Sequence, residues 1–238
     1  MEVRLTVIGS SPAWPNPGSA QSGYLVEGPG KLLLDCGPGV LARLREERVM
    51  PDAICITHWH LDHSGDLIPW AWLNAYSPEA GKTRPELWLP PGSAKELETF
   101  ASFWGVPRMW ERAFELREYA PGEPFEAAGF TIEAIQLPHY AMQAFGFRVR
   151  DHERGRVLAY SGDSAPTDEL AALARGADLF VCEATLADGT TDGELRGHLT
   201  AEEALEAADG RILLTHRPVE LPSPDGVAVA YDGFVTDV

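Results

Sequence analysis

Three histidines and one aspartate stand within six residues of one another, in the stretch Thr57-His58-Trp59-His60-Leu61-Asp62-His63. This stretch follows the short apolar run Ala-Ile-Cys-Ile, and the ends of strands are where a sandwich exposes its functional loops. Three imidazoles and a carboxylate can converge at this spacing only if a divalent cation offsets the cost of crowding them together. The stretch therefore predicts a metal site, and the alternative interpretation is a polar surface turn.

The H-x-H-x-D-H stretch resembles the signature of the metallo-β-lactamase superfamily, and three later motifs follow in the order of that family. Pro138-His139 comes after the apolar run Phe130–Leu137, Asp163 lies in Tyr-Ser-Gly-Asp-Ser, and His216 ends Leu-Leu-Thr-His. Four ordered motifs over nearly the whole chain are far more specific than any one of them. The resemblance implies a four-layer αββα sandwich of the α/β class, formed by one domain over residues 1–238.

By this resemblance, the chain would hold two divalent metal ions, either zinc or manganese. His58, His60 and His139 would bind one ion, Asp62, His63 and His216 would bind the other, and Asp163 would bridge them. Two cations about 3.5–4 Å apart repel strongly unless a shared carboxylate and a bridging hydroxide lie between them. A zinc-bound water can have its pKa lowered to about 7, which would supply a hydroxide nucleophile at neutral pH. Asp62 would also orient the attacking water.

The residues after His139 indicate a branch of the superfamily. Lactone and thioester hydrolases usually continue from this histidine with Thr-Pro-Gly-His, whereas this chain continues with Tyr-Ala-Met-Gln-Ala-Phe-Gly-Phe. That continuation resembles the ribonuclease Z and phosphodiesterase branch. The motifs Glu183-Ala-Thr, Gly-His198-Leu-Thr and Ala-Tyr-Asp232-Gly are similar to the same branch. The resemblance therefore implies a metal-dependent phosphodiesterase.

Asp62, His198 and Glu183 are the candidate catalytic residues. We expect His198 at the N-terminus of a helix, where backbone N–H groups favour an anion, so that it contacts a phosphoryl oxygen or protonates the leaving group. In the resembled enzymes the matching histidine pairs with the glutamate that matches Glu183. The residues alone leave open whether His198 merely neighbours a helix cap and whether Glu183 is a structural carboxylate.

Two features argue against full transfer RNA as the substrate. Ribonuclease Z enzymes carry a long RNA-gripping arm, commonly between the third histidine and the bridging aspartate, but the sequence between His139 and Asp163 has room for one hairpin only. A net charge of −17 also opposes general attraction to polyanions, although bound cations reverse the local field. The alternating arginines of that hairpin are typical of a solvated face. We expect a small phosphodiester, such as a cyclic nucleotide, a short oligonucleotide or an RNA end.

Other functions stay open at this point. The same metals would serve a carboxylic-ester, lactone or β-lactam hydrolase. A non-catalytic, metal-stabilised binding module is disfavoured, because such modules usually lose a ligand and all seven expected ligands are present. Flavin-linked di-iron proteins tend to replace the second histidine of H-x-H with glutamate, whereas this chain keeps His60.

The elements that must position these residues are short β-rich runs alternating with helical patterns, which indicates an α/β protein. Strands are expected at Glu2–Ile8, Gly23–Glu27, Lys31–Asp35, Asp52–Thr57, Glu86–Leu89, three times within Phe114–Leu137, and at Gln143–Arg150, Arg156–Tyr160, Asp178–Glu183 and Arg211–Thr215. Helices are expected from near Val40, over Asp66–Tyr76, from after Pro-Pro-Gly-Ser through Phe103, near Thr167–Ala174 and over Ala201–Ala208.

Composition limits the location and the partners of the chain. No apolar run approaches the ~18–20 residues of a membrane span, and the start lacks the layout of a signal peptide, so we expect a cytoplasmic protein without membrane contact. Cys36, Cys55 and Cys182 are far apart and lie in or beside apolar runs, which predicts buried thiols. Related enzymes are often homodimers, and the sequence leaves the oligomeric state open.

Overall fold

The computed structural model describes residues 2–238, and within that range the strands form two seven-stranded sheets. The first sheet contains β1 (Arg4–Gly9), β2 (Gly23–Glu27), β3 (Lys31–Leu34), β4 (Ala53–Cys55), β5 (Glu86–Leu89), β6 (Glu115–Glu118) and β14 (Val235–Asp237), in the order β14-β1-β2-β3-β4-β5-β6. The second contains β7 (Phe125–Ala127), β8 (Phe130–His139), β9 (Met142–Asp151), β10 (Arg156–Tyr160), β11 (Leu179–Glu183), β12 (Ile212–Thr215) and β13 (Ala228–Val229), in the order β13-β12-β11-β10-β9-β8-β7.

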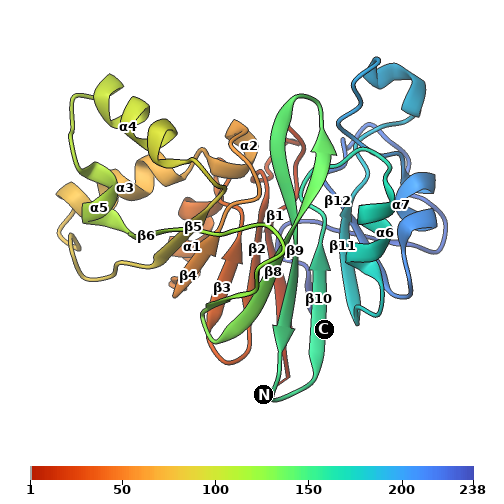
Figure 1. Cartoon of the computed structure of the whole chain (residues 1–238), viewed down its shortest axis with the longest axis horizontal. Coiled ribbons are helices and arrows are strands. Elements are labelled where there is room, and N and C mark those ends of the chain that lie inside the picture. Colours follow the sequence, from red (N-terminus) through yellow and green to blue (C-terminus); the bar gives the residue numbers. More distant parts are fainter. Residues whose placement is uncertain (1) are drawn as a thin grey trace.

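Helices cover the outer face of each sheet, so the chain has four layers (Figure 1). The first sheet carries α1 (Val40–Glu46), α3 (Leu67–Tyr76), α4 (Ala94–Phe103) and α5 (Met109–Ala113), and the second carries α6 (Asp168–Ala174) and α7 (Ala201–Ala207). The short helix α2 (Leu61–Ser64) and the 3-10 helix η1 (Gly189–Asp192) lie in loops at the upper end of the view in Figure 1. The expected αββα sandwich is therefore confirmed.

Alternating side chains on the strands build the layers. In β3, Leu32 and Leu34 pack between the two sheets, whereas Leu33 packs under the helices of the first sheet. In β2, Val26 faces the space between the sheets and Leu25 faces the helices. Strands that are covered on both faces must be apolar on both faces, which explains the uninterrupted Leu-Leu-Leu sequence of β3.

Strand direction brings distant parts of the sequence to one edge of the sandwich. β3, β4 and β5 are parallel neighbours in the first sheet, as are β10, β11 and β12 in the second. β8 runs in the same direction as β10, because both pair with β9 in antiparallel fashion. Since parallel strands end at the same edge, the loops after β8, β10, β11 and β12 meet there.

Most of the expected elements are present, and the differences concern short ones. The helices α2, α5 and η1 and the strands β13 and β14 were not expected, because so few residues show no clear periodicity. Cys36, Cys55 and Cys182 are buried free thiols, as expected. Among residues 2–238, no helix combines the length and the apolar composition needed to cross a bilayer. The assignment of one domain to residues 1–238 stays a prediction.

Leu33→Ala is expected to lower the free energy of unfolding by about 2–5 kcal/mol, because it removes buried methyl groups and leaves a cavity under the helices. The matched variant Leu205→Ala changes a side chain on α7 that is 38% exposed, so its loss should be about 1 kcal/mol or less. Urea unfolding followed by circular dichroism measures both. Similar losses in the two variants would argue against the layered core.

Candidate metal centre

The loop after β4 carries four of the expected ligands and is fixed by its own backbone. The N–H groups of His63 and Ser64 both donate to the carbonyl oxygen of His60, at 3.1 Å, which closes the turn of α2. The loop after β3 packs directly against this turn. A Cβ atom on Gly37 would lie 2.0 Å from the carbonyl oxygen of Asp62, so only glycine allows this close approach.

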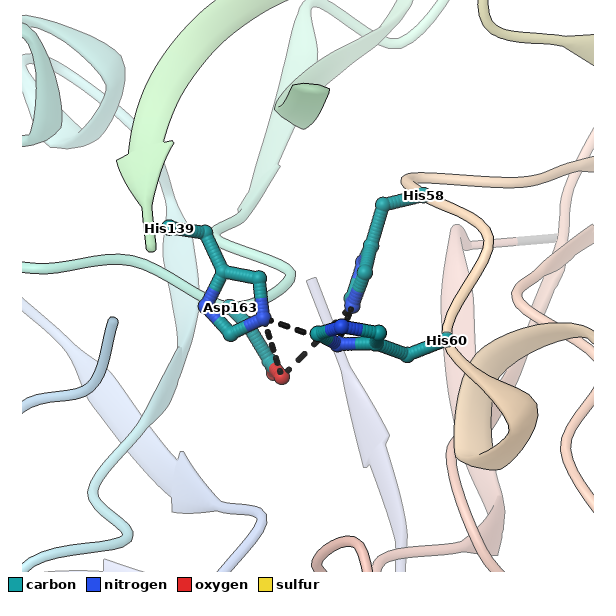
Figure 2. Close-up of side chains that lie close together, drawn as sticks. All are labelled: His58, His60, His139 and Asp163. Atoms are coloured by element: carbon teal, nitrogen blue, oxygen red, sulfur yellow. Dashed lines mark hydrogen bonds and ion pairs between the residues drawn. The ribbon is translucent and has the colours of Figure 1, made fainter. Parts of the chain in front are cut away.

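His58, His60, His139 and Asp163 converge on one point from three separate segments (Figure 2). One ligand atom of each lies within 4.8 Å of the others. His60 Nδ1 is 3.0 Å from His58 Nε2 and 2.9 Å from His139 Nε2. Asp163 Oδ2 is 3.7 Å from Nε2 of both His58 and His139. Three nitrogens and one oxygen around a common centre match the ligand types and the number of a zinc site.

Asp62, His63, Asp163 and His216 form a second group with the same spread. Asp62 Oδ2 is 3.0 Å from His216 Nε2 and 3.4 Å from His63 Nε2. Asp163 Oδ1 is 3.2 Å from His63 Nε2 and 3.7 Å from His216 Nε2. The two oxygens of Asp163 thus face different groups, and Asp163 would contact the ions of both groups if both were occupied. The structure brings all seven expected ligands together.

Two atoms of these groups are buried and form no hydrogen bond, namely His63 Nε2 and Asp163 Oδ1. They lie 3.2 Å apart, but they are not aligned for a hydrogen bond. A buried polar atom without a partner costs about 1–3 kcal/mol, and a cation in contact with both atoms would remove that cost. The donor set therefore fits divalent metal ions.

Charge differs between the two groups. Burial alone would lower the pKa of His63, but Asp163, Asp35 and Asp62 outweigh burial and raise this pKa well above its usual value. Burial, with a smaller contribution from His63, holds the pKa of His58 well below its usual value. His58 is therefore a neutral imidazole with a lone pair to offer, whereas the surroundings of His63 attract positive charge.

Four of the imidazoles have their second ring nitrogen held by a hydrogen bond. The pairs are His58 Nδ1 with Thr57 Oγ1 at 3.0 Å, His63 Nδ1 with Asp35 Oδ2 at 2.7 Å, His139 Nδ1 with the Gly197 carbonyl at 2.7 Å, and His216 Nδ1 with Thr185 Oγ1 at 2.9 Å. Such partners fix the ring orientation and raise the basicity of a ligand. In each case Nε2 is left to face the common centre.

Asp35 is the most connected of these partners, and sequence reasoning missed it. Its Oδ1 accepts from the backbone N–H of Thr57 at 2.8 Å, and its Oδ2 accepts from the Tyr160 hydroxyl at 2.6 Å and from His63. Because Asp35 follows β3 and Tyr160 ends β10, this carboxylate links the two sheets beneath the site. A fully buried carboxylate requires partners, but the sequence shows only an aspartate directly after Leu-Leu-Leu and does not identify those partners.

His198 and Glu183 lie beside the second group. His198 Nδ1 is 2.9 Å from Glu183 Oε1 and 3.9 Å from Asp163 Oδ2. The other oxygen of Glu183 accepts from the hydroxyl of Thr185, which also contacts His216. Burial would lower the pKa of His198, but Glu183 and nearby aspartates raise it to about 9.

The helix after His198 begins where it was expected, but the anion site expected at its N-terminus is wrong. The helix α7 begins at Ala201, and Thr200 and Glu203 close a capping box at its start. The backbone N–H of His198 donates to Asp192 Oδ2 at 2.9 Å, so it is not free to bind an anion. The side chain of Glu183, rather than a helix terminus, determines the surroundings of His198.

A family model for the "Beta-lactamase superfamily domain" matches residues 31–216 of the chain. The chain belongs to the metallo-β-lactamase superfamily. Rv1339 of Mycobacterium tuberculosis is 31% identical to it, over 99% of this chain and 89% of the relative. "Probable metallo-hydrolase YhfI" of Bacillus subtilis is 29% identical over 91% and 87% of the two chains. Ribonuclease Z of Mycobacterium bovis is 29% identical over 75% and 69%.

Three solved structures share this fold over at least 98% of the chain. The crystal structure of Bacillus subtilis YhfI matches with a TM-score of 0.83 and 26% identity, over all of both chains. Human tRNase Z, short form, has a TM-score of 0.77 at 24% identity, over 98% of each chain. A diphosphatase from the PhnP family has a TM-score of 0.76 at 20% identity, over 99% and 98%. The expected resemblance to the ribonuclease Z and phosphodiesterase branch is confirmed.

Asp163→Ala is expected to remove most of the bound metal, because Asp163 faces both groups. Zinc added to the chelator-treated wild type should raise its unfolding temperature, since a ligand that binds only the native state stabilises by about 2.7 kcal/mol at a hundredfold excess over Kd. The Asp163→Ala protein should show no such rise. Elemental analysis and thermal unfolding measure both effects, with the exposed Asp188→Asn as the control. Full metal content in Asp163→Ala would refute the assignment.

Asp35→Asn is expected to weaken metal retention about 10- to 100-fold, because an amide supports the imidazole of His63 less well than a carboxylate does. Tyr24→Phe is the matched control in the same core. It removes a hydroxyl that lies 2.7 Å from Thr215 Oγ1 and should cost about 1 kcal/mol of stability without weakening metal retention. Competition with a chromophoric chelator measures the metal affinity. Equal affinities of wild type and Asp35→Asn would contradict this role.

Proposed function

We propose that this metallo-hydrolase cleaves a small phosphodiester, such as a cyclic nucleotide, a short oligonucleotide or an RNA end, at two divalent metal ions. The main support for this proposal is the pair formed by His198 and the fully buried Glu183. His198 Nδ1 lies 2.9 Å from Glu183 Oε1, beside the carboxylate of Asp163. An acid beside the ligands suits a leaving group that needs a proton. The similarity to ribonuclease Z of Mycobacterium bovis supports the same class of substrate.

The side chains of the two groups would hold zinc or manganese. Bound there, the ions would lower the pKa of a water molecule and polarise the phosphoryl oxygens. Asp62 is only 5% exposed, and its Oδ2 lies 3.0 Å from His216. Its carboxylate would accept a hydrogen bond from the attacking water and orient it toward phosphorus.

His198 would act as the general acid. Because Glu183 holds Nδ1, Nε2 is the nitrogen left for the substrate. A pKa of about 9 keeps both ring nitrogens protonated at neutral pH. As the bond from phosphorus to the leaving oxygen breaks, the proton on Nε2 would pass to that oxygen.

The small size of the proposed substrate follows from the arginines of the β9–β10 hairpin. Arg148 donates to carbonyl oxygens at the end of α6, Arg154 pairs with Asp151 at 2.6 Å, and Arg156 pairs with Asp178 at 2.9 Å. Guanidinium groups that are used in this way form no continuous basic track for a long phosphate backbone. Only β9 and β10 lie between His139 and Asp163, which leaves no room for an RNA-gripping arm.

Turnover of bis(p-nitrophenyl) phosphate tests this proposal directly. The zinc- or manganese-loaded wild type should exceed the His58→Ala, Asp62→Ala double variant by more than about 100-fold, since losing even a partner of a ligand costs 10- to 100-fold. A lactone and a cephalosporin are assayed in parallel. Faster turnover of either would favour the ester, lactone or β-lactam alternative. No turnover of any substrate, with one tightly held ion per chain, would favour a binding module.

A further inference from the structure

Asp192, the last residue of η1, holds the backbone directly before and at His198. Its Oδ2 accepts from the N–H of Gly197 at 2.7 Å and from the N–H of His198 at 2.9 Å. Its Oδ1 accepts from the hydroxyl of Tyr140 at 2.6 Å. One carboxylate thus ties the segment of His198 to the turn between β8 and β9.

Tyr140 adopts a backbone conformation that non-glycine residues rarely use, with φ of +48°. The residue is 41% exposed, so burial contributes little to holding it there. Its ring lies directly on Gly197, where a Cβ atom would be 2.4 Å from the nearest ring carbon. Tyr140 and Gly197 are therefore shaped to fit each other at the rim of the metal centre.

The imidazole of His198 is confined from several directions. The ring of His216 stacks on it with centroids 5.7 Å apart, and Tyr140 meets it edge to face at 5.5 Å and 82°. Glu183 holds Nδ1, and Asp192 holds the backbone N–H. The contacts from Tyr140 and Asp192 come from the turn after β8 and from η1, outside the two groups of expected ligands.

We propose that Asp192 and Tyr140 are positioning residues, which present the imidazole of His198 to the leaving oxygen of the substrate. This inference rests on the proposed phosphodiesterase function. In that reaction the oxygen of the attacking water forms a bond to phosphorus and gives up a proton to solvent. The bond from phosphorus to the leaving oxygen breaks, its electron pair stays on that oxygen, and the proton on His198 Nε2 moves there. Asp192 and Tyr140 act only through His198 and do not touch the substrate.

Leaving-group dependence separates positioning of an acid from general support of the loop. An alkoxide, such as the ribose oxygen released from a dinucleotide, is strongly basic and needs the proton as it departs. A p-nitrophenolate is weakly basic and departs without one. A misplaced acid should therefore slow the first reaction and leave the second nearly unchanged.

The experiment compares the metal-loaded variants Asp192→Asn, Tyr140→Phe and His198→Ala with wild type, on a dinucleotide and on bis(p-nitrophenyl) phosphate. Asp192→Asn should lower kcat on the dinucleotide about 10- to 100-fold and change kcat on the aryl ester by about twofold or less. His198→Ala should show the same pattern with a larger loss, and Tyr140→Phe a smaller one. Asp188→Asn is the control, because Asp188 caps η1 through Thr190 N–H and contacts neither Gly197 nor His198.

Two readouts other than turnover accompany the kinetics. Metal content and the unfolding temperature of Asp192→Asn should match those of wild type. Amide hydrogen exchange in the peptide that contains Gly197 and His198 should become faster in Asp192→Asn and stay unchanged in Asp188→Asn, since only Asp192 accepts from these N–H groups.

The outcomes that overturn the inference are distinct from failure of the proposed function. Equal losses on both substrates, no loss on either, or reduced metal content in Asp192→Asn would each reject positioning through His198. If His198→Ala shows the leaving-group pattern and Asp192→Asn does not, the positioning inference is wrong but the proposed function stands. If wild type cleaves neither phosphodiester, or His198→Ala shows no pattern, the proposed acid fails and the inference fails with it.

Discussion

A buried carboxylate that faces imidazoles on both sides is the constraint on which the rest of this structure depends. Asp163 is almost fully buried, and each of its oxygens points to a different group of histidines. Burial would raise the pKa of Asp163, but His216 and His63 outweigh burial and hold it well below its usual value, so the carboxylate stays ionised. An ionised group in this position needs positive charge close to both oxygens, and the two ligand groups supply sites for it.

The αββα sandwich meets this constraint by fixing each ligand at the end of a strand. Residues from the ends of β8, β10 and β12 meet the loop after β4 because the strands run in one direction. Asp35 then joins the two sheets by contacting His63 from one side and Tyr160 from the other. The packing of both sheets therefore fixes the positions of the expected ligands.

The parts of the site that the sequence predicted are those with a local pattern. His58 to His63 are neighbours in the chain, and His139, Asp163 and His216 each end an apolar run, so their convergence could be expected. Asp35, Thr185 and Asp192 could not be assigned, because their roles depend on partners that are distant in sequence. The anion site expected at His198 was wrong, since the capping box of Thr200 and Glu203 closes the start of the helix and Asp192 accepts from the N–H of His198.

Glu183 connects the expected metal ligand His216 to the proposed acid His198. Its Oε1 accepts from His198 Nδ1 and from the N–H of Ser164, the residue after Asp163. Its Oε2 accepts from the hydroxyl of Thr185, which in turn orients His216. Glu183 thus supports His198, the backbone after Asp163 and, through Thr185, His216 by separate hydrogen bonds. The orientation of the acid is therefore coupled to the geometry of the ligands by one buried carboxylate, and the loop that carries Asp192 completes the position of the acid from outside.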